Sequence, residues 1–222
     1  MKLTIFGAGG GIGRQLVEQA IAAGNDVTVV VRDPAKAPPR SVRTVTADLL
    51  AADPAALTSA VGGADAVLSA LGPANNAAAG VASKGTTAII QAMHETAVRR
   101  LIVVSAAPVG TTPSPGRPHP PKRDPGDRFF LGYVMYPIIK AALRPQYLDL
   151  GLMEDALRDS GLDWTAVRPV QLTDKPLTGT YRAALGRNLP GGRYISRADV
   201  AHYMLRALEQ PETIHQTVGL AN

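Results

Sequence analysis

The chain has 222 residues, a formal net charge of +5 and a sequence pI near 9.7, and 45% of its residues are hydrophobic. Mean hydropathy is +0.03, and no apolar run approaches the roughly 20 residues of a membrane span, which excludes disordered and membrane-embedded classes. The absence of cysteine excludes disulfides, thiolate metal ligands and a cysteine nucleophile. We expect a cytoplasmic protein, because an apolar strand at the start leaves no room for a signal peptide.

The basic residues are scattered along the sequence and form no dense block. We therefore expect no nucleic-acid partner, and the lack of a long apolar run predicts no membrane partner. We interpret the excess charge as suited to anionic small molecules. The histidines are dispersed without the spacing of metal ligands, so no metal site is expected. They are His94, His119, His202 and His215.

The first predicted unit is a strand, a glycine turn and a helix within residues 3–21. Gly7, Gly10 and Gly13 follow the apolar run Leu3–Phe6 and open a segment with helical apolar spacing. In such a turn one glycine allows unusual backbone angles, one admits a pyrophosphate, and one lets helix and strand pack closely. The helix start offers unpaired N–H groups to the phosphates. The predicted cofactor contacts here are Gly7, Gly10, Gly11, Ile12, Gly13 and Arg14.

A second buried strand is predicted over Asp26–Val31, and the residues after it bear on cofactor choice. NAD-preferring enzymes place a carboxylate here for the ribose 2'-hydroxyl, whereas a 2'-phosphate requires a cation. Arg32, with Arg14 and Lys36, favours NADP(H) over NAD(H), while Asp33 leaves NAD as an alternative.

Residues 42–46 form the third predicted strand, followed by Asp48 and Leu49 as candidate cofactor contacts. The Asp48 carboxylate either accepts from the adenine amino group or caps a turn, and the sequence does not separate these roles. Asp53 and Pro54 have the pattern of a helix N-cap and first helical residue.

A fourth strand over Asp65–Ala70, a helix over 80–98 and a fifth strand over Arg100–Val104 complete a repeating pattern. Strands alternating with helices predict an α/β fold, a Rossmann-type doubly wound parallel sheet, with ligands at the carboxyl ends of the strands. The candidate contacts at these ends are Ala70, Leu71, Gly72 and Ser105.

We expect one domain over residues 1–222, with a small C-terminal extension on the substrate side and an irregular segment at about 108–145. Seven prolines between Pro108 and Pro125 prevent a helix or central strand there. An apolar helical stretch over 129–143 ends at Pro145, before a helix over 146–160. The segment is predicted to be a lid over the crevice, with a surface arm or dimer contact as the alternative.

Two later segments carry a family resemblance. SGLDWTAVRPVQLTDKPLTGTYR (160–182) and ISRADVA (195–201), with the opening glycine motif, resemble the atypical short-chain dehydrogenase/reductases, in particular the NmrA-like NAD(P)-binding group that includes flavin reductases of the biliverdin reductase B type. The resemblance implies a Rossmann-type fold that binds NADP(H) and delivers hydride to flavins, tetrapyrroles or quinone-like acceptors.

Site residues follow from this resemblance position by position. Arg32 matches the cation for the 2'-phosphate, Asp48 the acid near adenine, and Ser105 the hydroxyl near the nicotinamide. The backbone of Arg168, Pro169 and Val170 would face the carboxamide. Where related flavin reductases have a histidine in this turn, the chain has Gln171, which puts any imidazole role in doubt.

The Tyr-x-x-x-Lys pair of ordinary short-chain dehydrogenases is not clearly present. Tyr136 and Lys140 have the spacing but fall in the irregular segment, whereas the expected helix has Tyr147 with Gly151 at the lysine position. Although Tyr136 is kept as a candidate catalytic residue, a core tyrosine and a surface lysine are expected. On the same helix, Glu154 is expected to be exposed and paired with Arg158, with a role in orienting a substrate or carrying a proton as the alternative.

The sequence supports two functions. The first is an NADPH-dependent oxidoreductase that transfers hydride to a planar conjugated acceptor, which can be anionic. In this function Ser105 forms a hydrogen bond to the nicotinamide or the acceptor, and solvent supplies the proton. The alternative is a catalytically weak NADP(H)-binding redox sensor. A monomer or a homodimer is compatible with either.

Overall fold

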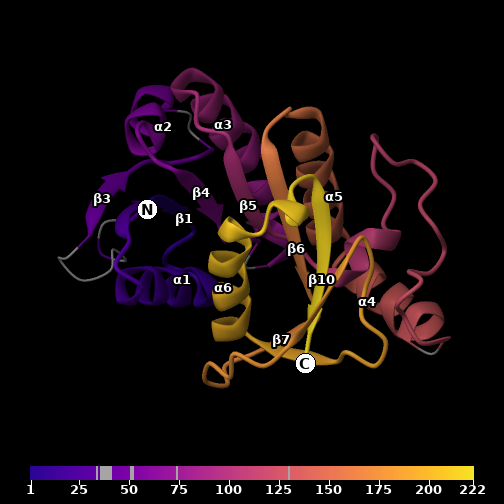
Figure 1. Cartoon of the computed structure of the whole chain (residues 1–222). Helices are drawn as coiled ribbons and strands as arrows, with labels where there is room; N and C mark the ends of the chain where they lie inside the picture. Colours follow the sequence, from indigo (N-terminus) through magenta and orange to yellow (C-terminus); the bar gives the residue numbers. More distant parts are fainter. Residues whose placement is uncertain (34, 36–41, 51–52, 74, 130) are drawn as a thin grey trace.

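The computed structural model describes residues 1–33, 35, 42–50, 53–73, 75–129 and 131–222. Its core is an eight-stranded sheet in the order β3-β2-β1-β4-β5-β6-β10-β8 (Figure 1). All neighbouring strands are parallel except β8, which runs antiparallel to β10 at one edge. The predicted doubly wound parallel sheet is therefore confirmed.

The first five strands lie within one residue of the bounds that the apolar runs predicted, and the later strands had no predicted bounds. The main sheet contains β1 (Lys2–Phe6), β2 (Asp26–Val31), β3 (Arg43–Thr46), β4 (Ala66–Ser69), β5 (Arg100–Val104), β6 (Asp163–Pro169), β8 (Arg182–Leu185) and β10 (Gln216–Ala221). A separate parallel pair, β7 (Gln171–Thr173) and β9 (Tyr194–Ser196), belongs to the C-terminal extension.

Helices cover both faces of the sheet (Figure 1). One face carries α1 (Gly11–Ala22) and α6 (Arg197–Arg206), and the other carries α2 (Pro54–Val61), α3 (Val81–Thr96) and α5 (Arg144–Asp159). The shorter helical elements are η2 (Asn76–Ala78), η3 (Ala107–Thr111), the π-helical turn η4 (Leu131–Met135), α4 (Tyr136–Ala142), η5 (Ala207–Glu209) and η6 (Pro211–Thr213).

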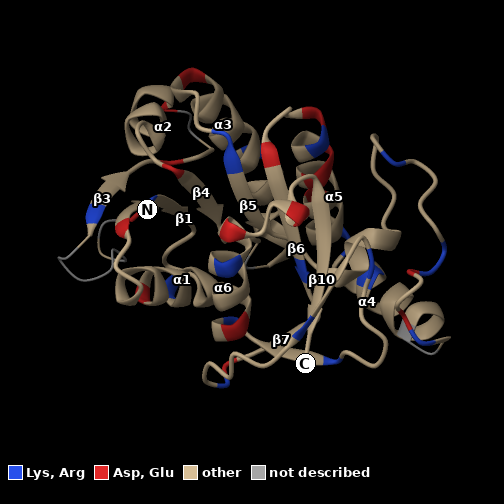
Figure 2. Ribbon diagram, viewed as in Figure 1, with Lys and Arg blue, Asp and Glu red and all other residues tan. Residues whose placement is uncertain are grey.

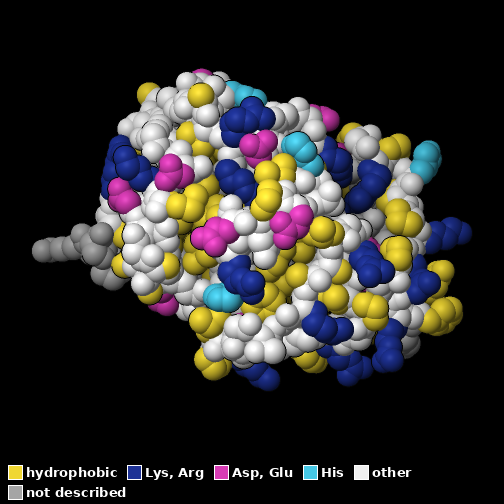
Figure 3. Space-filling model, in the orientation of Figure 1, with side chains coloured by type: hydrophobic (Ala, Val, Ile, Leu, Met, Phe, Trp, Pro, Cys, Tyr) yellow, Lys and Arg dark blue, Asp and Glu magenta, His cyan; other side chains and the backbone are white. Residues whose placement is uncertain are grey.

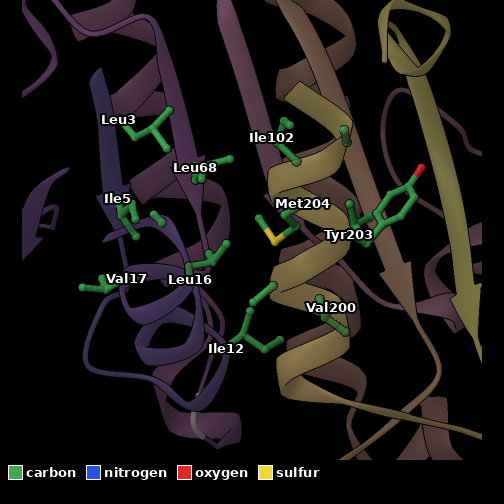
Figure 4. Packing of buried hydrophobic residues seen from close by; sticks show 14 of the residues in the cluster. Leu3, Ile5, Ile12, Leu16, Val17, Leu68, Ile102, Val200, Tyr203 and Met204 are labelled. Atoms are coloured by element: carbon green, nitrogen blue, oxygen red, sulfur yellow. The ribbon is translucent and has the colours of Figure 1, made fainter. Parts of the chain in front are cut away.

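Each face has its own core, because successive side chains of a strand point to opposite faces. Leu3 and Ile5 of β1 pack toward α1 and α6, where they meet Leu16 and Met204 (Figure 4). The side chain of Phe6 belongs to the cluster on the opposite face, with α2, α3 and α5. All of these side chains are fully buried.

Two proline signals mark helix starts. Asp53 Oδ1 accepts from the Ala56 amide at 3.1 Å with Pro54 in the first turn of α2, which confirms the predicted N-cap. The predicted break between two helices is confirmed, because α4 ends at Ala142 and α5 starts at Arg144, two residues before the predicted start, with Pro145 in its first turn. Proline is tolerated there because the first-turn amides have no helical partner.

Candidate cofactor and acceptor site

The predicted contact residues gather at one edge of the sheet. Gly7, Arg32 and Ser105 directly follow β1, β2 and β5, and Ala70 follows β4. The chain leaves β1 and β4, which are neighbours, toward opposite ends of the sheet order. Such a switch point opens a crevice at the carboxyl ends of the strands, where dinucleotides bind in folds of this class.

The glycine turn is built as the spacing indicates. Gly7 has φ +75°, and a Cβ there would lie 2.7 Å from the backbone of Ala70. A Cβ at Gly13 would lie 2.0 Å from the Gly7 carbonyl oxygen, so this glycine is needed for packing of helix on strand. At Gly10 a Cβ would meet only that same oxygen, at 3.3 Å, and the residue is exposed. Gly10 is therefore the glycine whose open side can face a ligand.

Two arginines lie against this turn. The Arg14 Nε donates to the Gly9 carbonyl oxygen at 3.2 Å, which keeps an exposed guanidinium beside the start of α1. Arg197, the first residue of α6, packs so closely that a Cβ on Gly11 would lie 2.5 Å from its Cδ. Arg197 was not among the predicted site residues. Its position in the ISRADVA segment was the available signal.

The residues near the predicted adenosine end are exposed. Arg32 follows β2 with an exposed side chain, and Asp33 Oδ1 accepts from the Ala35 amide at 3.0 Å. Asp48 Oδ1 accepts from the Leu50 amide at 3.0 Å, which is the turn-capping alternative, although its side chain also stays exposed. Lys36, the third proposed cation, lies outside the described residues.

The surroundings of Leu49 and Leu71 differ from those of Gly72. A Cβ on Gly85 of α3 would lie 2.9 Å from Leu71 Cδ1 and 3.4 Å from Leu49 Cδ1, so both leucines pack on that helix. A Cβ on Gly72 would meet nothing within 4 Å. The chain after β4 therefore leaves open space at Gly72, while the two leucine side chains pack on α3.

A cavity of about 770 Å³ opens beside the ends of β5 and β6. Ser105, Pro169 and Val170 line it from the sheet, and Met135, Tyr136 and Ile139 line it from the segment predicted to be a lid. Its remaining lining residues are Ala106, Pro108, Arg128, Tyr147, Gln171, Leu172, Gly191, Gly192, Arg193, Tyr194 and Arg197. The cavity is mainly apolar and aromatic, with three arginines, and Arg197 joins it to the glycine turn.

A buried carboxylate, that of Glu154, lies behind Ser105 at the sheet side of this cavity. Glu154 Oε1 accepts from Ser105 Oγ at 2.7 Å and from Arg168 Nε at 2.8 Å, and its Oε2 accepts from the Arg168 guanidinium at 2.5 Å. Glu154 is 1% exposed, so the prediction of a surface carboxylate was wrong, although Arg158 does lie 3.7 Å away. Burial alone would raise the pKa of Glu154, but Arg168 outweighs it and the pKa is lowered.

This pairing also fixes the role of Arg168. Its side chain is buried against Glu154 and does not line the cavity, whereas the next two residues, Pro169 and Val170, do. Any cofactor contact from this turn therefore comes from its backbone, as the resemblance implied, or from Pro169 and Val170.

A family model described as NAD(P)H-binding matches residues 7–211. The chain belongs to this NAD(P)H-binding family. The match begins at the first glycine of the turn and runs through α6, so it includes both the crevice and the cavity wall. The prediction of an NAD(P)H-dependent oxidoreductase is confirmed at the level of the family.

Individual relatives are more distant. An uncharacterized sugar epimerase, YhfK of Bacillus subtilis, is 37% identical over 79 residues, and the match spans 36% of each chain. The oxidoreductase ylbE of Lactococcus lactis has the same fold (TM-score 0.77, 19% identity, 100% of this chain and 91% of that chain). A protein of Streptococcus pneumoniae named as a candidate NADH-flavin reductase is also similar (TM-score 0.72, 25% identity, 100% and 99%).

Tyr136 is buried as expected of a core tyrosine, whereas Lys140 differs from the expectation of a surface lysine. Tyr136 shares the cavity with Ser105 and Tyr147, so the irregular segment does reach the site. Lys140 was expected on the surface but is half-buried, and its Nζ donates to Thr111 O at 2.8 Å and Thr111 Oγ1 at 2.9 Å. Burial raises the pKa of Tyr136 and of Tyr147 above the usual range, so both phenols keep their protons.

Within the ranges that the structure describes, no cluster of metal-ligating side chains is found. Among the same residues, no helix has both the length and the apolar character needed to cross a bilayer.

Proposed function

We propose that the protein is an NADPH-dependent reductase that delivers hydride to a planar conjugated acceptor bound in the cavity. The observation that carries this proposal is the cavity itself, because it is walled by Tyr136, Tyr147 and Pro169 and meets Ser105 at the carboxyl end of β5. In this fold a nicotinamide ring at the crevice would face that space. A bound NADPH would supply the hydride.

The buried pair makes Ser105 an acceptor toward the cavity. Its Oγ proton is directed to Glu154, whose carboxylate stays ionised beside Arg168, so the remaining lone pairs of Ser105 can accept from a carboxamide or a phenol. Ser105 then orients a ring without taking up a proton itself. This role suits an acceptor such as a flavin or quinone, which can take its proton from solvent.

Tyr136 and Tyr147 offer phenolic hydrogen-bond donors to an acceptor in the cavity. Both phenols stay protonated, and the Lys140 ammonium donates to Thr111. A Lys-activated phenolate of the ordinary short-chain dehydrogenase kind is therefore not supported, which disfavours sugar epimerisation or dehydration. The similarity to a candidate flavin reductase of Streptococcus pneumoniae supports an acceptor of the flavin type.

The preference for NADP(H) is argued from this chain's own residues. Arg32 and Arg14 are exposed beside the crevice, while one carboxylate oxygen of Asp33 is occupied by the Ala35 amide. A 2'-phosphate would find two guanidinium groups there. Arg128, Arg193 and Arg197 around the cavity favour an acceptor that carries negative charge.

The second candidate is a redox sensor that binds NADP(H) without turnover. Such a sensor would bind the cofactor in the same crevice as a reductase. Steady-state oxidation of NADPH with FMN, riboflavin and a set of quinones separates the two. Sustained acceptor-dependent turnover supports the reductase. NADPH binding without turnover, together with a partner protein whose affinity differs between NADP⁺ and NADPH, supports the sensor.

A further inference from the structure

The arm, defined as residues 122–144 and including η4 and α4, exposes an unusual share of apolar side chains. Phe129 is 74% exposed and Ile138 is 61% exposed, and Tyr133, Val134 and Met135 are between 37% and 48% exposed. Five of the 13 large apolar side chains that are exposed in the described part of the chain thus fall within residues 129–138. Monomeric proteins rarely gather exposed apolar side chains in this way without a partner.

The same end of the molecule is strongly basic. Segments 106–148 and 175–198 hold 11 of the 23 Lys and Arg residues but only two of the 18 Asp and Glu residues, so the remainder of the chain is net acidic. Those two acids, Asp124 and Asp127, are 3% exposed. Figure 2 shows several Lys and Arg positions at the end that carries α4, and in Figure 3 basic and hydrophobic side chains are interspersed there.

The two basic segments lie together. The Asn188 amide donates to Asp124 Oδ1 at 2.8 Å, and Asn188 Nδ2 donates to Asp127 Oδ1 at 3.0 Å. Both acids are used inside this contact, which leaves the outer surface to the cations. Arg123 lies 5.7 Å above the ring of Tyr133, and the Phe129 and Tyr133 rings are 4.9 Å apart, so charge and aromatic surface are adjacent.

We propose that this surface docks on an anionic lipid bilayer. The arm face is defined by Lys122, Arg123, Phe129, Tyr133, Val134, Ile138 and Arg144, of which all but the half-buried Arg123 are exposed. Apolar and aromatic side chains flanked by lysine and arginine are what an interfacial segment needs, because the rings enter the acyl boundary while the cations contact anionic headgroups. The absence of exposed acids from residues 122–144 removes the repulsion that such a surface would otherwise impose.

Docking in this orientation brings the cavity to the membrane. Ile138 points outward, whereas its neighbours Met135, Tyr136 and Ile139 line the cavity. An acceptor dissolved in the bilayer would then enter along α4. The docking surface itself does not depend on the proposed reductase function, since it lies on the outer side of the arm. It replaces the expectation, drawn from the sequence, that no membrane takes part.

The test is sedimentation of the full chain with phosphatidylcholine vesicles, with and without phosphatidylglycerol. We expect binding to the anionic vesicles that weakens as salt is raised. Phe129→Ser/Ile138→Ser and Lys122→Glu/Arg144→Glu should each weaken it by about tenfold or more. Ile21→Ser on α1 and Lys84→Glu on α3 are matched controls with exposed side chains, and they should bind as the unmodified protein does.

Several results would overturn the proposal. One is equal binding, or none, to the two kinds of vesicle. Another is a dimer in analytical ultracentrifugation that Phe129→Ser/Ile138→Ser dissociates, because the arm face would then be covered by a second copy. Equally tight, salt-sensitive binding to a random DNA duplex would assign the cations to nucleic acid instead. Acceptor reduction in solution is a separate readout, so failure of docking and failure of the reductase function are distinguishable.

Discussion

Ser105 Oγ and Glu154 Oε1 are 2.7 Å apart, although 49 residues separate them in the sequence. The contact ties the end of β5, where the nicotinamide is expected, to α5. Arg168 completes it from the end of β6, so one buried carboxylate sets the relative position of three elements around the cavity. Glu154 thus holds these elements in place without lining the cavity itself, whereas Ser105 lines it.

Glu154→Gln should destabilise the protein by about 3 kcal/mol, because it leaves the buried Arg168 guanidinium without its counter-charge. Arg158→Ala is the control, since that partly exposed side chain should contribute only about 1 kcal/mol or less. Urea denaturation measures both. A loss for Glu154→Gln no larger than that for Arg158→Ala would contradict the structural role of the pair.

Gly10→Val should remain folded yet lose most of its affinity for NADPH. A Cβ at Gly10 meets only one atom, at 3.3 Å, but it stands on the exposed side of the turn. Gly13→Val should instead lose about 3 kcal/mol or more of stability, because its Cβ would lie 2.0 Å from the Gly7 oxygen. Cofactor titration and urea denaturation separate the two effects. If Gly10→Val binds NADPH normally, the cluster is only a turn.

Arg32→Ala should weaken NADPH binding by about tenfold or more and leave NADH binding unchanged, because a charge-assisted contact to the 2'-phosphate contributes about 1.5 to 3 kcal/mol. Arg99→Ala, just before β5 at the amino end of the sheet, should change neither. Calorimetric titration of both cofactors is the measurement. Equal affinity of the unmodified protein for NADPH and NADH would show that no preference exists.

Asp127 should make stability depend on pH. Burial raises its pKa from the ordinary 3.8 to about 6, and its buried Oδ2 has no hydrogen-bond partner in the described part of the chain. The native state therefore holds a proton that the unfolded chain releases first, so the stability from this group is present below pH 3.8 and is lost as the pH rises through about 6.

Relative to Asp127→Asn, the unfolding free energy of the unmodified protein should fall by about 2 kcal/mol between about pH 4 and about pH 7. Asp174→Asn is the control, since this carboxylate is 88% exposed. Denaturation across this pH range measures the difference. A difference that does not change with pH would mean that Asp127 titrates normally.

The sequence predicted the sheet because its signals are local. Apolar runs fixed β1 to β5 and the glycine spacing fixed the turn, and neither needs a distant partner. The burial of Glu154 was not predicted because its i,i+4 spacing to Arg158 is typical of an exposed pair on a helix. That spacing carries no information about contacts between α5 and β6. Arg168 within the apolar run of β6 was the missed signal, since a buried arginine requires a carboxylate.

Tyr136 was underrated for a related reason. A lid over the crevice was predicted, but the prolines between 108 and 125 removed any periodic pattern from which the path of the chain could be inferred, so the position of Tyr136 in the cavity was not predictable. The contacts that set this path join residues far apart in sequence, such as Asp124 with Asn188 and Ser114 with Asp155.

Rapid anaerobic mixing of the NADPH-loaded protein with FMN or a soluble quinone tests whether hydride passes from NADPH to an acceptor held in the cavity beside Ser105. We predict prompt oxidation of the nicotinamide, slowed by deuterium at its C4. Ile139→Trp, which fills the cavity, should lose this reaction while keeping NADPH affinity, and Ile138→Trp on the outer side of α4 should not. Bound NADPH that no acceptor oxidises, or oxidation that Ile139→Trp leaves unchanged, would show that hydride is not transferred in this cavity.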